Sequence, residues 1–436
     1  MTSMTSRHFP INRRRFLSAT ATASAGLALP EWFLRREQVL AAVPKPLSPN
    51  DKPGIALVGC GGMGRGDGAA ASRFGEMRAI CDVDDGNLAQ AKRSWPKADT
   101  FKDFRKVMER DDVHVVLCGT PDHWHTLVSM AALRAGKDVY CEKPLTLTIE
   151  EGQKLVETSR TTGRILQTGS QQRSDRNFRL ACELVRNGRI GKLKNAVVGL
   201  PTGPREGPFS PSPVPPGLDW DLWLGQCPKV DYVRQRCHGT FRYWYDYSGG
   251  MMTDWGAHHL DIVQWANGTE RSGPVEIEGK SLVEMIPGGF ETASQYDLKY
   301  TYANGVTVHC KSEAPDNVPN GVKFEGAAGW IFVTRGRIQA SDPALLNEPL
   351  PASAEKLYVS RDHMGNLFEC VRSRKQPICE AEIGHRSVSV CHLGVISIRL
   401  GRKLRWDPAK ERFVNDAEAD KRIARERRKP WTYDAV

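Results

Sequence analysis

Between residues 54 and 170 the sequence alternates short, apolar, β-rich runs with helical patterns. The runs typical of strands are IALVGC, MRAICDV, VHVVLCGT, KDVYCEKP and RILQTGS. Because a helix separates each strand from the next, right-handed βαβ crossovers must join them, and such crossovers produce a parallel sheet. This part of the chain therefore predicts an α/β fold.

The pattern changes after residue 170. A helical stretch, RNFRLACELVRNG, precedes the strand-like KNAVVGL, a Pro-rich loop over residues 201–216 and an aromatic segment that ends at Trp265. Alternating strands such as LKYTYANGVTVHCKSEA follow and predict a large, mainly antiparallel sheet with helices on one face. A chain of 436 residues fits two domains behind a leader. We place the leader at residues 1–45, the first domain at 50–170 and the second at 171–436.

The amino terminus carries a basic motif before a weakly apolar stretch. The run from Asn12 to Leu17 reads NRRRFL and resembles a bacterial twin-arginine export signal. Charged residues limit the following apolar run to about a dozen residues, short of the ~20 that span a membrane. The resemblance implies passage through the twin-arginine translocation machinery to the periplasm, already folded and with any cofactor already bound. The alternative is a basic, disordered terminus.

The net charge of +10 does not indicate a nucleic-acid-binding surface. Residues 1–45 contribute +5 and residues 402–436 contribute +4, which leaves about +1 for the rest of the chain. We expect the basic run KRIARERRKP near the carboxyl terminus to be a solvated helix end. Eleven cysteines occur without any C-x-x-C pair, and four of them close apolar runs, which favours reduced core residues over a zinc site.

A glycine-rich loop follows the first strand directly and opens a small-residue helix. It contains Gly59, Gly61, Gly62, Met63 and Gly64. Glycines there permit a tight turn and a close approach to a pyrophosphate, whose charge meets the helix amino terminus. These features predict a Rossmann domain.

Asp82 ends the second strand, 23 residues after Gly59, where a carboxylate can accept hydrogen bonds from the adenosine ribose. The same carboxylate disfavours a 2′-phosphate. The predicted cofactor is therefore NAD rather than NADP.

Three further motifs stand in order along the chain. They are GTPDHWH at residues 119–125, CEKP at residues 141–144 and GGMMTDWGAHHLD at residues 249–261. Together with the glycine loop they resemble the glucose-fructose oxidoreductase, inositol dehydrogenase and rhizopine-catabolism (Gfo/Idh/MocA) family over residues 54–400. Asp122 stands where many members have Asn, and the Pro-rich loop with the aromatic segment looks lineage-specific.

The resemblance implies roles for individual residues. Glu142 would contact the nicotinamide ribose, Lys143 would orient or activate the reacting hydroxyl, and Pro144 would follow a cis bond. Asp254 and His258 would form an acid/base dyad. Thr120, Pro121 and His125 would line the cofactor site.

The chemistry of alcohol oxidation requires the same types of group: a base, a cation for the alkoxide, and a nicotinamide held against the carbinol hydrogen. Asp254 and His258 are four residues apart and Asp261 is three further on, so one helical face would hold all three. A carboxylate beside an imidazole would raise its basicity. The alternative is that Asp254 caps a helix and His258 packs in a core.

Other side chains are candidates for substrate contact or for structure. Arg173, Trp255 and Asp261 are the substrate candidates, and an ion pair at the surface is the alternative for Arg173. Five tryptophans between residues 220 and 265 could stack on a sugar or fill a core. His259 is expected to be structural. No carboxylate or thiol cluster accompanies His123 and His125 in the sequence, so no metal centre is predicted.

The favoured function is an NAD-dependent dehydrogenase acting on a sugar, glycoside or cyclitol, in a homo-oligomer. An exported enzyme cannot draw on cytosolic NAD, so the cofactor is expected to stay tightly bound. The alternatives are a glycoside hydrolase that uses NAD for transient oxidation and a non-catalytic sugar-binding relative. The family's hydrolytic members tend to lack the E-K-P lysine, so Lys143 favours dehydrogenation.

Overall fold

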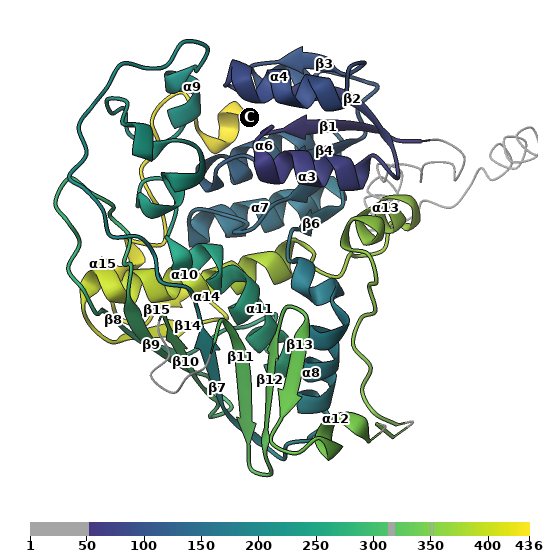
Figure 1. The fold of residues 1–436 in the computed structure, drawn as a ribbon, viewed down its shortest axis with the longest axis vertical. Helices are drawn as coiled ribbons and strands as arrows, with labels where there is room; N and C mark the ends of the chain where they lie inside the picture. Colours follow the sequence, from purple (N-terminus) through teal and green to yellow (C-terminus); the bar gives the residue numbers. More distant parts are fainter. Residues whose placement is uncertain (1–51, 313–318, 349, 352) are drawn as a thin grey trace, which may run out of the picture. The chain divides into compact units, whose positions relative to one another are not determined.

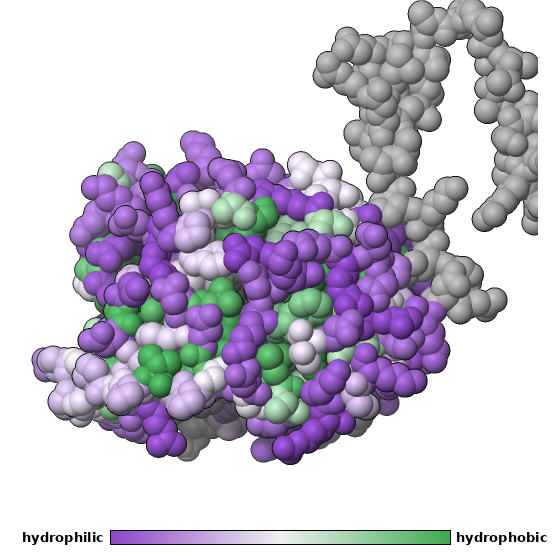
Figure 2. Space-filling model, turned by 90° about the horizontal axis from the view of Figure 1, so that it is seen from above, coloured by the Kyte–Doolittle hydropathy of each residue, from purple (hydrophilic) through white to green (hydrophobic). Residues whose placement is uncertain are grey.

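The computed structural model describes residues 52–312, 319–348, 350–351 and 353–436. They belong to one unit, Pro46–Val436, whereas the predicted leader lies outside the described residues. Within the described ranges, no helix is long and apolar enough to cross a membrane. On the face drawn in Figure 2, hydrophobic residues form small groups among hydrophilic ones.

The first sheet has six parallel strands in the order β3-β2-β1-β4-β5-β6 (Figure 1). Its strands are β1 (Gly54–Val58), β2 (Glu76–Cys81), β3 (Asp99–Phe101), β4 (Val115–Cys118), β5 (Asp138–Cys141) and β6 (Leu166–Thr168). The predicted parallel Rossmann sheet is confirmed. The sequence pattern missed only β3, because this three-residue edge strand is not buried and has no apolar run.

Helices connect these strands in the expected alternation. They are α3 (Gly62–Ala71), α4 (Asp85–Ser94), α5 (Phe104–Met108), α6 (Asp122–Arg134) and α7 (Ile149–Thr162). The Asp84 carboxylate caps α4 by accepting from two backbone N–H groups, and the Thr148 hydroxyl caps α7. Gly163 ends α7 at φ 63°, in the left-handed conformation that favours glycine.

The second sheet has nine strands, and only the pair β7–β10 is parallel. In spatial order the strands are β13 (Arg337–Ala340), β12 (Trp330–Thr334), β11 (Gly321–Gly326), β7 (Leu193–Gly199), β10 (Thr307–Lys311), β9 (Tyr296–Thr301), β8 (Glu276–Ser281), β14 (Leu404–Asp407) and β15 (Arg412–Phe413). The predicted mainly antiparallel sheet is therefore confirmed. The boundary between residues 170 and 171 stays a prediction.

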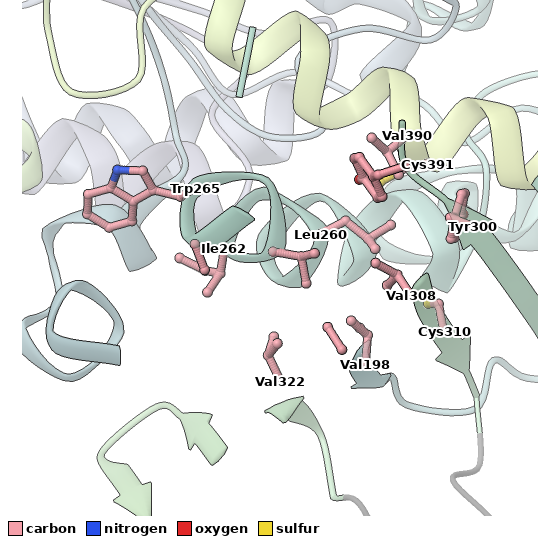
Figure 3. Close-up of a cluster of buried hydrophobic side chains, with 14 of the residues drawn as sticks. Val198, Leu260, Ile262, Trp265, Tyr300, Val308, Cys310, Val322, Val390 and Cys391 are labelled. Carbon is pink, nitrogen blue, oxygen red and sulfur yellow. The ribbon is translucent and has the colours of Figure 1, made fainter. Parts of the chain in front are cut away.

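Helices cover one face of this sheet and form the larger core with it. The helices on this sheet are α8 (Arg176–Arg186), α11 (Gly256–Asn267), α12 (Ala344–Asn347) and α14 (Ala381–Leu400). In contrast, α13 (His363–Ser373) packs against α3 and shares the hydrophobic cluster of the first sheet. Figure 3 shows Leu260 of α11 facing Val308 of β10 and Val198 of β7, with Cys391 of α14 beside them. In Figure 1, α14 runs between the two sheets. It contacts α7 and β6 of the first and β8 of the second.

Two expectations about the composition can be checked in the structure. All eleven cysteines are buried and free of disulfides, as predicted. The basic carboxyl-terminal run is not a solvated helix end, which corrects the sequence interpretation. The chain has no regular helix between α15 (Ala417–Asp420) and the last turn at Tyr433–Ala435, and the Arg427 and Arg428 side chains are only 15% and 20% exposed.

Candidate active site

A pocket of about 650 Å³ opens at the carboxyl ends of β1, β2, β4 and β5. From the Rossmann side it is lined by Gly59, Gly61, Gly62, Met63, Asp82, Thr120, Pro121, His125, Glu142 and Lys143. The structure therefore brings together every predicted cofactor-binding residue except Gly64, which packs beneath the loop. Ligands bind at this edge in open α/β sheets, where the strand order reverses between β1 and β4.

The glycine loop has the geometry that a pyrophosphate requires. Gly59 has φ +89°, and a Cβ there would lie 2.5 Å from the backbone of Gly119. A Cβ on Gly64 would lie 1.9 Å from the Gly59 carbonyl oxygen. In contrast, Cβ positions on Gly61 and Gly62 would meet nothing within 4 Å. No side chain caps α3, so its first N–H groups remain free to bind an anion. The residues present fit a dinucleotide.

Asp82 ties the glycine loop to the end of β2. Its Oδ2 accepts a hydrogen bond from Cys60 N at 2.7 Å, and its Oδ1 accepts one from Asp84 N at 2.9 Å. Burial raises the pKa of Asp82, and the two backbone hydrogen bonds oppose that rise. The carboxylate faces the pocket at the end where an adenosine ribose would lie.

The E-K-P motif stands at the end of β5, on the opposite side of the pocket from Asp82. The Lys143–Pro144 bond is cis, as the resemblance implied. Glu142 accepts hydrogen bonds from the Tyr140 hydroxyl at 3.2 Å and from Gln171 Nε2 at 2.8 Å. Burial raises the pKa of Glu142, although the charge of Lys143 opposes that rise. These bonds fix the carboxyl group at the pocket wall.

Lys143 is held by Asp254, the last residue of α10 (Met251–Asp254). Lys143 Nζ donates to Asp254 Oδ1 at 2.5 Å and to its carbonyl oxygen at 3.2 Å. Arg242 Nε donates to the same Oδ1 at 3.3 Å. Burial alone would raise the pKa of Asp254, but the charges of Lys143 and Arg242 outweigh it and hold this pKa below 3.8. Asp254 is therefore an ionised partner of Lys143 rather than a proton acceptor.

His258 does not form the predicted dyad with Asp254. The helix is interrupted at Trp255, so Asp254 ends α10 and His258 lies in the first turn of α11. The buried Nδ1 of His258 has no partner, and neither ring nitrogen forms a hydrogen bond to a described residue. Burial lowers the pKa of His258 well below 6.5, and the charges of Lys143 and Arg335 lower it further. The expected rise in basicity is wrong, because the carboxylate points at Lys143.

Arg173 and Asp261, both predicted to contact substrate, form a buried ion pair instead. Arg173 Nε and Nη2 donate to Asp261 at 2.7–3.0 Å, and the two side chains are 1% and 0% exposed. Arg173 also pairs with Glu270 and lies over the Trp265 ring. Ser387 donates to Asp261 Oδ1 at 2.6 Å. With no exposed surface, the pair stabilises the packing of α11 and corrects both the surface-pair and the substrate interpretations.

Buried thiols accompany His125, contrary to the expectation from the sequence. Cys118, His125 and Cys141 place their ligand-type atoms within 4.8 Å of one another. Burial raises the pKa of Cys118, but a hydrogen bond with Cys141 and the charge of His125 lower it to about 6. Both ring nitrogens of His125 already face carbonyl oxygens, of Pro144 at 2.7 Å and of Thr120 at 2.9 Å. His125 thus braces the loops around the cis bond. His259, expected to be structural, is buried and bonds to Asn320.

The side of the pocket that faces away from the Rossmann sheet is lined by the segment that follows the Pro-rich loop. Residues 217–242, here named the cover segment, contain α9 (Trp220–Leu224) and two short 3-10 turns. They line the pocket with Leu222, Trp223, His238, Gly239, Phe241 and Arg242. Most of the large aromatic side chains here and in residues 243–247 form their own hydrophobic cluster, so Trp220, Trp223 and Trp244 are buried. Trp265 is buried in the main core. Of the five tryptophans between residues 220 and 265, only Trp255 is half-buried rather than buried.

Hydrogen bonds to the backbone of the cover segment fasten it to both sides of the cofactor pocket. On the β2 side, Asp219 N donates to Val83 O at 3.0 Å and Asp85 N donates to Gly217 O at 3.1 Å. On the α6 side, the Trp223 carbonyl oxygen lies 2.8 Å from His123 Nε2 and 3.0 Å from Trp124 Nε1. The part of the segment from Gly217 to Trp223 therefore bridges the β2 side and the α6 side of the pocket.

The carboxyl-terminal tail packs behind the cover segment. Arg428 Nε donates to Gly225 O at 2.9 Å, and its Nη1 donates to Asp221 at 2.6 Å. Trp431 packs edge-on against Trp124 at 4.8 Å. The tail does not line the pocket itself. It braces the cover segment and fastens it to α6.

Comparisons with known proteins agree with this architecture. The family profile described as "Oxidoreductase family, NAD-binding Rossmann fold" matches residues 54–170, and "Oxidoreductase family, C-terminal alpha/beta domain" matches residues 205–433. A myo-inositol 2-dehydrogenase of Thermotoga maritima is 29% identical over 208 residues, which are 48% of this chain and 52% of that protein. An alpha-N-acetylgalactosaminidase of Shewanella oneidensis is 28% identical over 204 residues, or 42% and 44% of the two chains. The chain thus spans about half the length of the curated relatives it matches.

Solved structures share the fold at lower identity. Levoglucosan dehydrogenase in complex with NADH and levoglucosan aligns with a TM-score of 0.61 at 18% identity, covering 81% of this chain and 99% of that one. Aldose-aldose oxidoreductase of Caulobacter crescentus aligns with a TM-score of 0.60 at 20% identity, covering 81% and 99%. Since the second family profile alone spans more than half of the chain and the first matches the Rossmann part, the protein belongs to the Gfo/Idh/MocA family of NAD-binding oxidoreductases.

Proposed function

We propose that the protein is an NAD-dependent dehydrogenase that oxidises a secondary hydroxyl of a sugar, glycoside or cyclitol. The observation that carries this proposal is Lys143, at the end of the cofactor pocket farther from Asp82. Its ammonium group has three N–H donors, and Asp254 takes two of them. Among the described residues nothing takes the third, which therefore remains available to a substrate oxygen.

Each remaining group has a task in this reaction. A nicotinamide ring bound beside Glu142 would supply the hydride chemistry. Lys143 stabilises the negative charge that develops on the substrate oxygen, and Asp254 fixes the direction of Lys143 Nζ. Burial lowers the pKa of His258, and its buried Nδ1 has no hydrogen-bond partner among the described residues, so we assign to it the removal of the hydroxyl proton. The imidazole can accept the proton once a substrate hydroxyl forms the hydrogen bond that the ring lacks.

The second candidate is NAD-assisted glycoside hydrolysis, and the similarity to the Shewanella oneidensis alpha-N-acetylgalactosaminidase favours it. Both functions use the same pocket, but only the dehydrogenase leaves the cofactor reduced, and only the hydrolase releases an aglycone. The test is to incubate the protein with free sugars and with aryl glycosides, measuring reduced cofactor and released aglycone together. We expect reduced cofactor to accumulate with a free sugar. Release of aglycone without accumulation of reduced cofactor would instead establish the hydrolase.

The pKa of His258 predicts an unusual pH profile. Its pKa is lowered well below 6.5, so the ring stays neutral as the pH falls through the range where an ordinary histidine becomes charged. We expect kcat/KM to hold steady near pH 6.5 and to fall only in more acidic solution. His258→Ala should lower kcat about 10²-fold and remove this acidic limb. If the pH profiles of the variant and the wild type coincide, the base must be reassigned to Lys143.

Asp82 predicts a preference for NAD over NADP. Its carboxylate faces the ribose end of the pocket, and Asp84 lies beside it, so a 2′-phosphate would meet two acids. We expect protein stripped of cofactor to bind NADH at least ~10-fold more tightly than NADPH in calorimetric titrations. Asp82→Asn should bring the affinities for NADH and NADPH closer together. We expect it to weaken NADH binding and to improve NADPH binding by a larger factor. Equal affinities in the wild type would contradict the assignment.

We propose further that the cofactor stays bound and that the protein is exported by the twin-arginine route. The fastened cover segment supports slow release, because a dinucleotide beneath it could leave only after the segment opens. Protein purified without added NAD should therefore contain it and should react with sugar directly. Arg428→Ala removes three side-chain hydrogen bonds that brace the segment, one to Gly225 and two to Asp221, and should speed cofactor loss about tenfold.

The matched control for the retention experiment is Lys429→Ala, since Lys429 is the exposed neighbour of Arg428. Cofactor loss is followed by the fall in reduced-nicotinamide fluorescence after dilution into an enzyme trap. A wild-type protein that emerges empty and exchanges NAD freely would defeat the bound-cofactor proposal.

A further inference from the structure

Two cations meet one carboxylate at the reacting end of the pocket. Lys143 and Arg242 both contact the single carboxylate of Asp254, at 2.5 Å and 3.3 Å. Asp122 and Glu142 also line this pocket, but both are buried and burial raises the pKa of each, so Asp254 is the acid there whose pKa the two cations lower. Arg242 also lines the pocket itself and is 31% exposed, so it remains accessible from the pocket.

A third cation, Arg335, does not line the cofactor pocket but lies near His258, whose pKa its charge lowers. It lies in the turn between β12 and β13, and its guanidinium is 4.8 Å from the centre of the Trp255 ring. The Trp255 ring in turn contacts the ring of His258, with 5.9 Å between centroids. Arg335 is exposed, and within the described part of the chain it forms no hydrogen bond or ion pair. Its planar group is therefore positioned by stacking, with its donors still free.

The electrostatic surroundings of His258 agree with this arrangement. The charged groups that act most strongly on its ring are Lys143 and Arg335, and both lower its pKa. Two cations, Lys143 and Arg335, therefore act on the space beside His258. A neutral polyol would leave the charge of Arg335 without a partner, whereas an anionic substrate would compensate it.

We propose that the substrate is a sugar with an anionic group, such as a uronic acid, an aldonic acid or a sugar phosphate, and that Arg335 binds this group. A guanidinium matches both carboxylate and phosphate oxygens through paired N–H donors. Trp255 supplies a half-buried aromatic surface beside it, on which the sugar ring can stack. The reacting hydroxyl then lies toward Lys143 and His258. This proposal rests on the proposed dehydrogenase function and names its substrate class.

The experiment compares neutral and anionic sugars of the same stereochemistry. The probes are glucose, glucuronate, gluconate and glucose 6-phosphate, and galactose with galacturonate, each assayed for cofactor reduction by the full chain. We expect kcat/KM to be at least ~10-fold higher for one anionic member than for its neutral partner, with a difference that shrinks as salt is added. Comparison of glucuronate with glucose 6-phosphate identifies which anion the site takes.

Substitution of Arg335 separates substrate selection from catalysis. Arg335→Gln should raise KM for the anionic sugar about tenfold relative to KM for the neutral sugar, and Arg335→Glu should raise it further. Arg337→Gln is the matched control, because Arg337 is exposed two residues away and bonds only to Gln339. Calorimetric binding of the anionic sugar to the protein with reduced cofactor should weaken in parallel.

The outcomes distinguish the anionic-substrate proposal from the dehydrogenase proposal on which it rests. If neutral sugars reduce the cofactor as well as anionic ones, and Arg335→Gln changes neither KM nor binding, the anionic substrate is excluded while the dehydrogenase stands. If no sugar of either charge reduces the cofactor and none binds, the proposed function fails and the substrate class fails with it.

Discussion

Lys143→Ala should abolish turnover while the protein remains folded and binds NAD. The side chain stands at the pocket end with one free N–H donor, and it is the group that would meet the developing negative charge on the substrate oxygen. Removing one such charge stabiliser typically costs ~10²-fold or more in kcat. We expect this loss in kcat rather than in KM, because the interaction is strongest in the transition state.

The control for this prediction is Lys106→Ala, an exposed lysine in α5 that pairs only with Glu109. Circular dichroism and NADH titration establish that the Lys143 variant keeps its fold and its cofactor site. A Lys143→Ala variant with near wild-type kcat would show that the active site has been placed wrongly.

Asp261→Asn should destabilise the protein by about 3–5 kcal/mol without directly altering substrate recognition. The substitution leaves the Arg173 guanidinium almost completely buried with only the partly exposed Glu270 to compensate it. A buried charge that loses its partner keeps its desolvation cost, so the loss exceeds that of a surface pair. Urea unfolding of cofactor-free protein measures the change.

The control for Asp261 is a double substitution. Arg173→Met combined with Asp261→Leu removes both charges and should be less destabilising than Asp261→Leu alone. If Asp261→Asn unfolds at the wild-type urea concentration but raises KM for a sugar, Asp261 contacts substrate after all and the structural role is wrong.

The fold was predictable because its strongest signals are local. Val115–Cys118 and Asp138–Cys141 are short apolar strands that each follow a helix, and that pattern alone implies parallel crossovers. The glycine loop was equally predictable, since Gly59 and Gly64 must lack side chains for the backbone to approach itself. By contrast, β3 is too short and exposed to leave a periodic pattern.

The candidate site was predictable only in part, because it depends on contacts between segments distant in sequence. The i, i+4 spacing of Asp254 and His258 suggested a dyad, but the spacing could not show that Lys143, 111 residues away, would bind Asp254 first. Likewise, nothing in the local sequence shows that Arg173 lies against Asp261, or that Trp223 lies over the cofactor pocket. Burial and tertiary pairing, rather than residue type, decide these roles.

The most direct test of the central claim follows a labelled hydrogen from the sugar to the nicotinamide. A sugar deuterated at the carbon that is oxidised is mixed with the purified protein, and the cofactor is released and weighed by mass spectrometry. The proposed dehydrogenase predicts one deuterium on the reduced nicotinamide, formed in proportion to the oxidised sugar. Sugar conversion without deuterium in the cofactor, or deuterium returned to a hydrolysed product with no net reduction, would contradict the proposal.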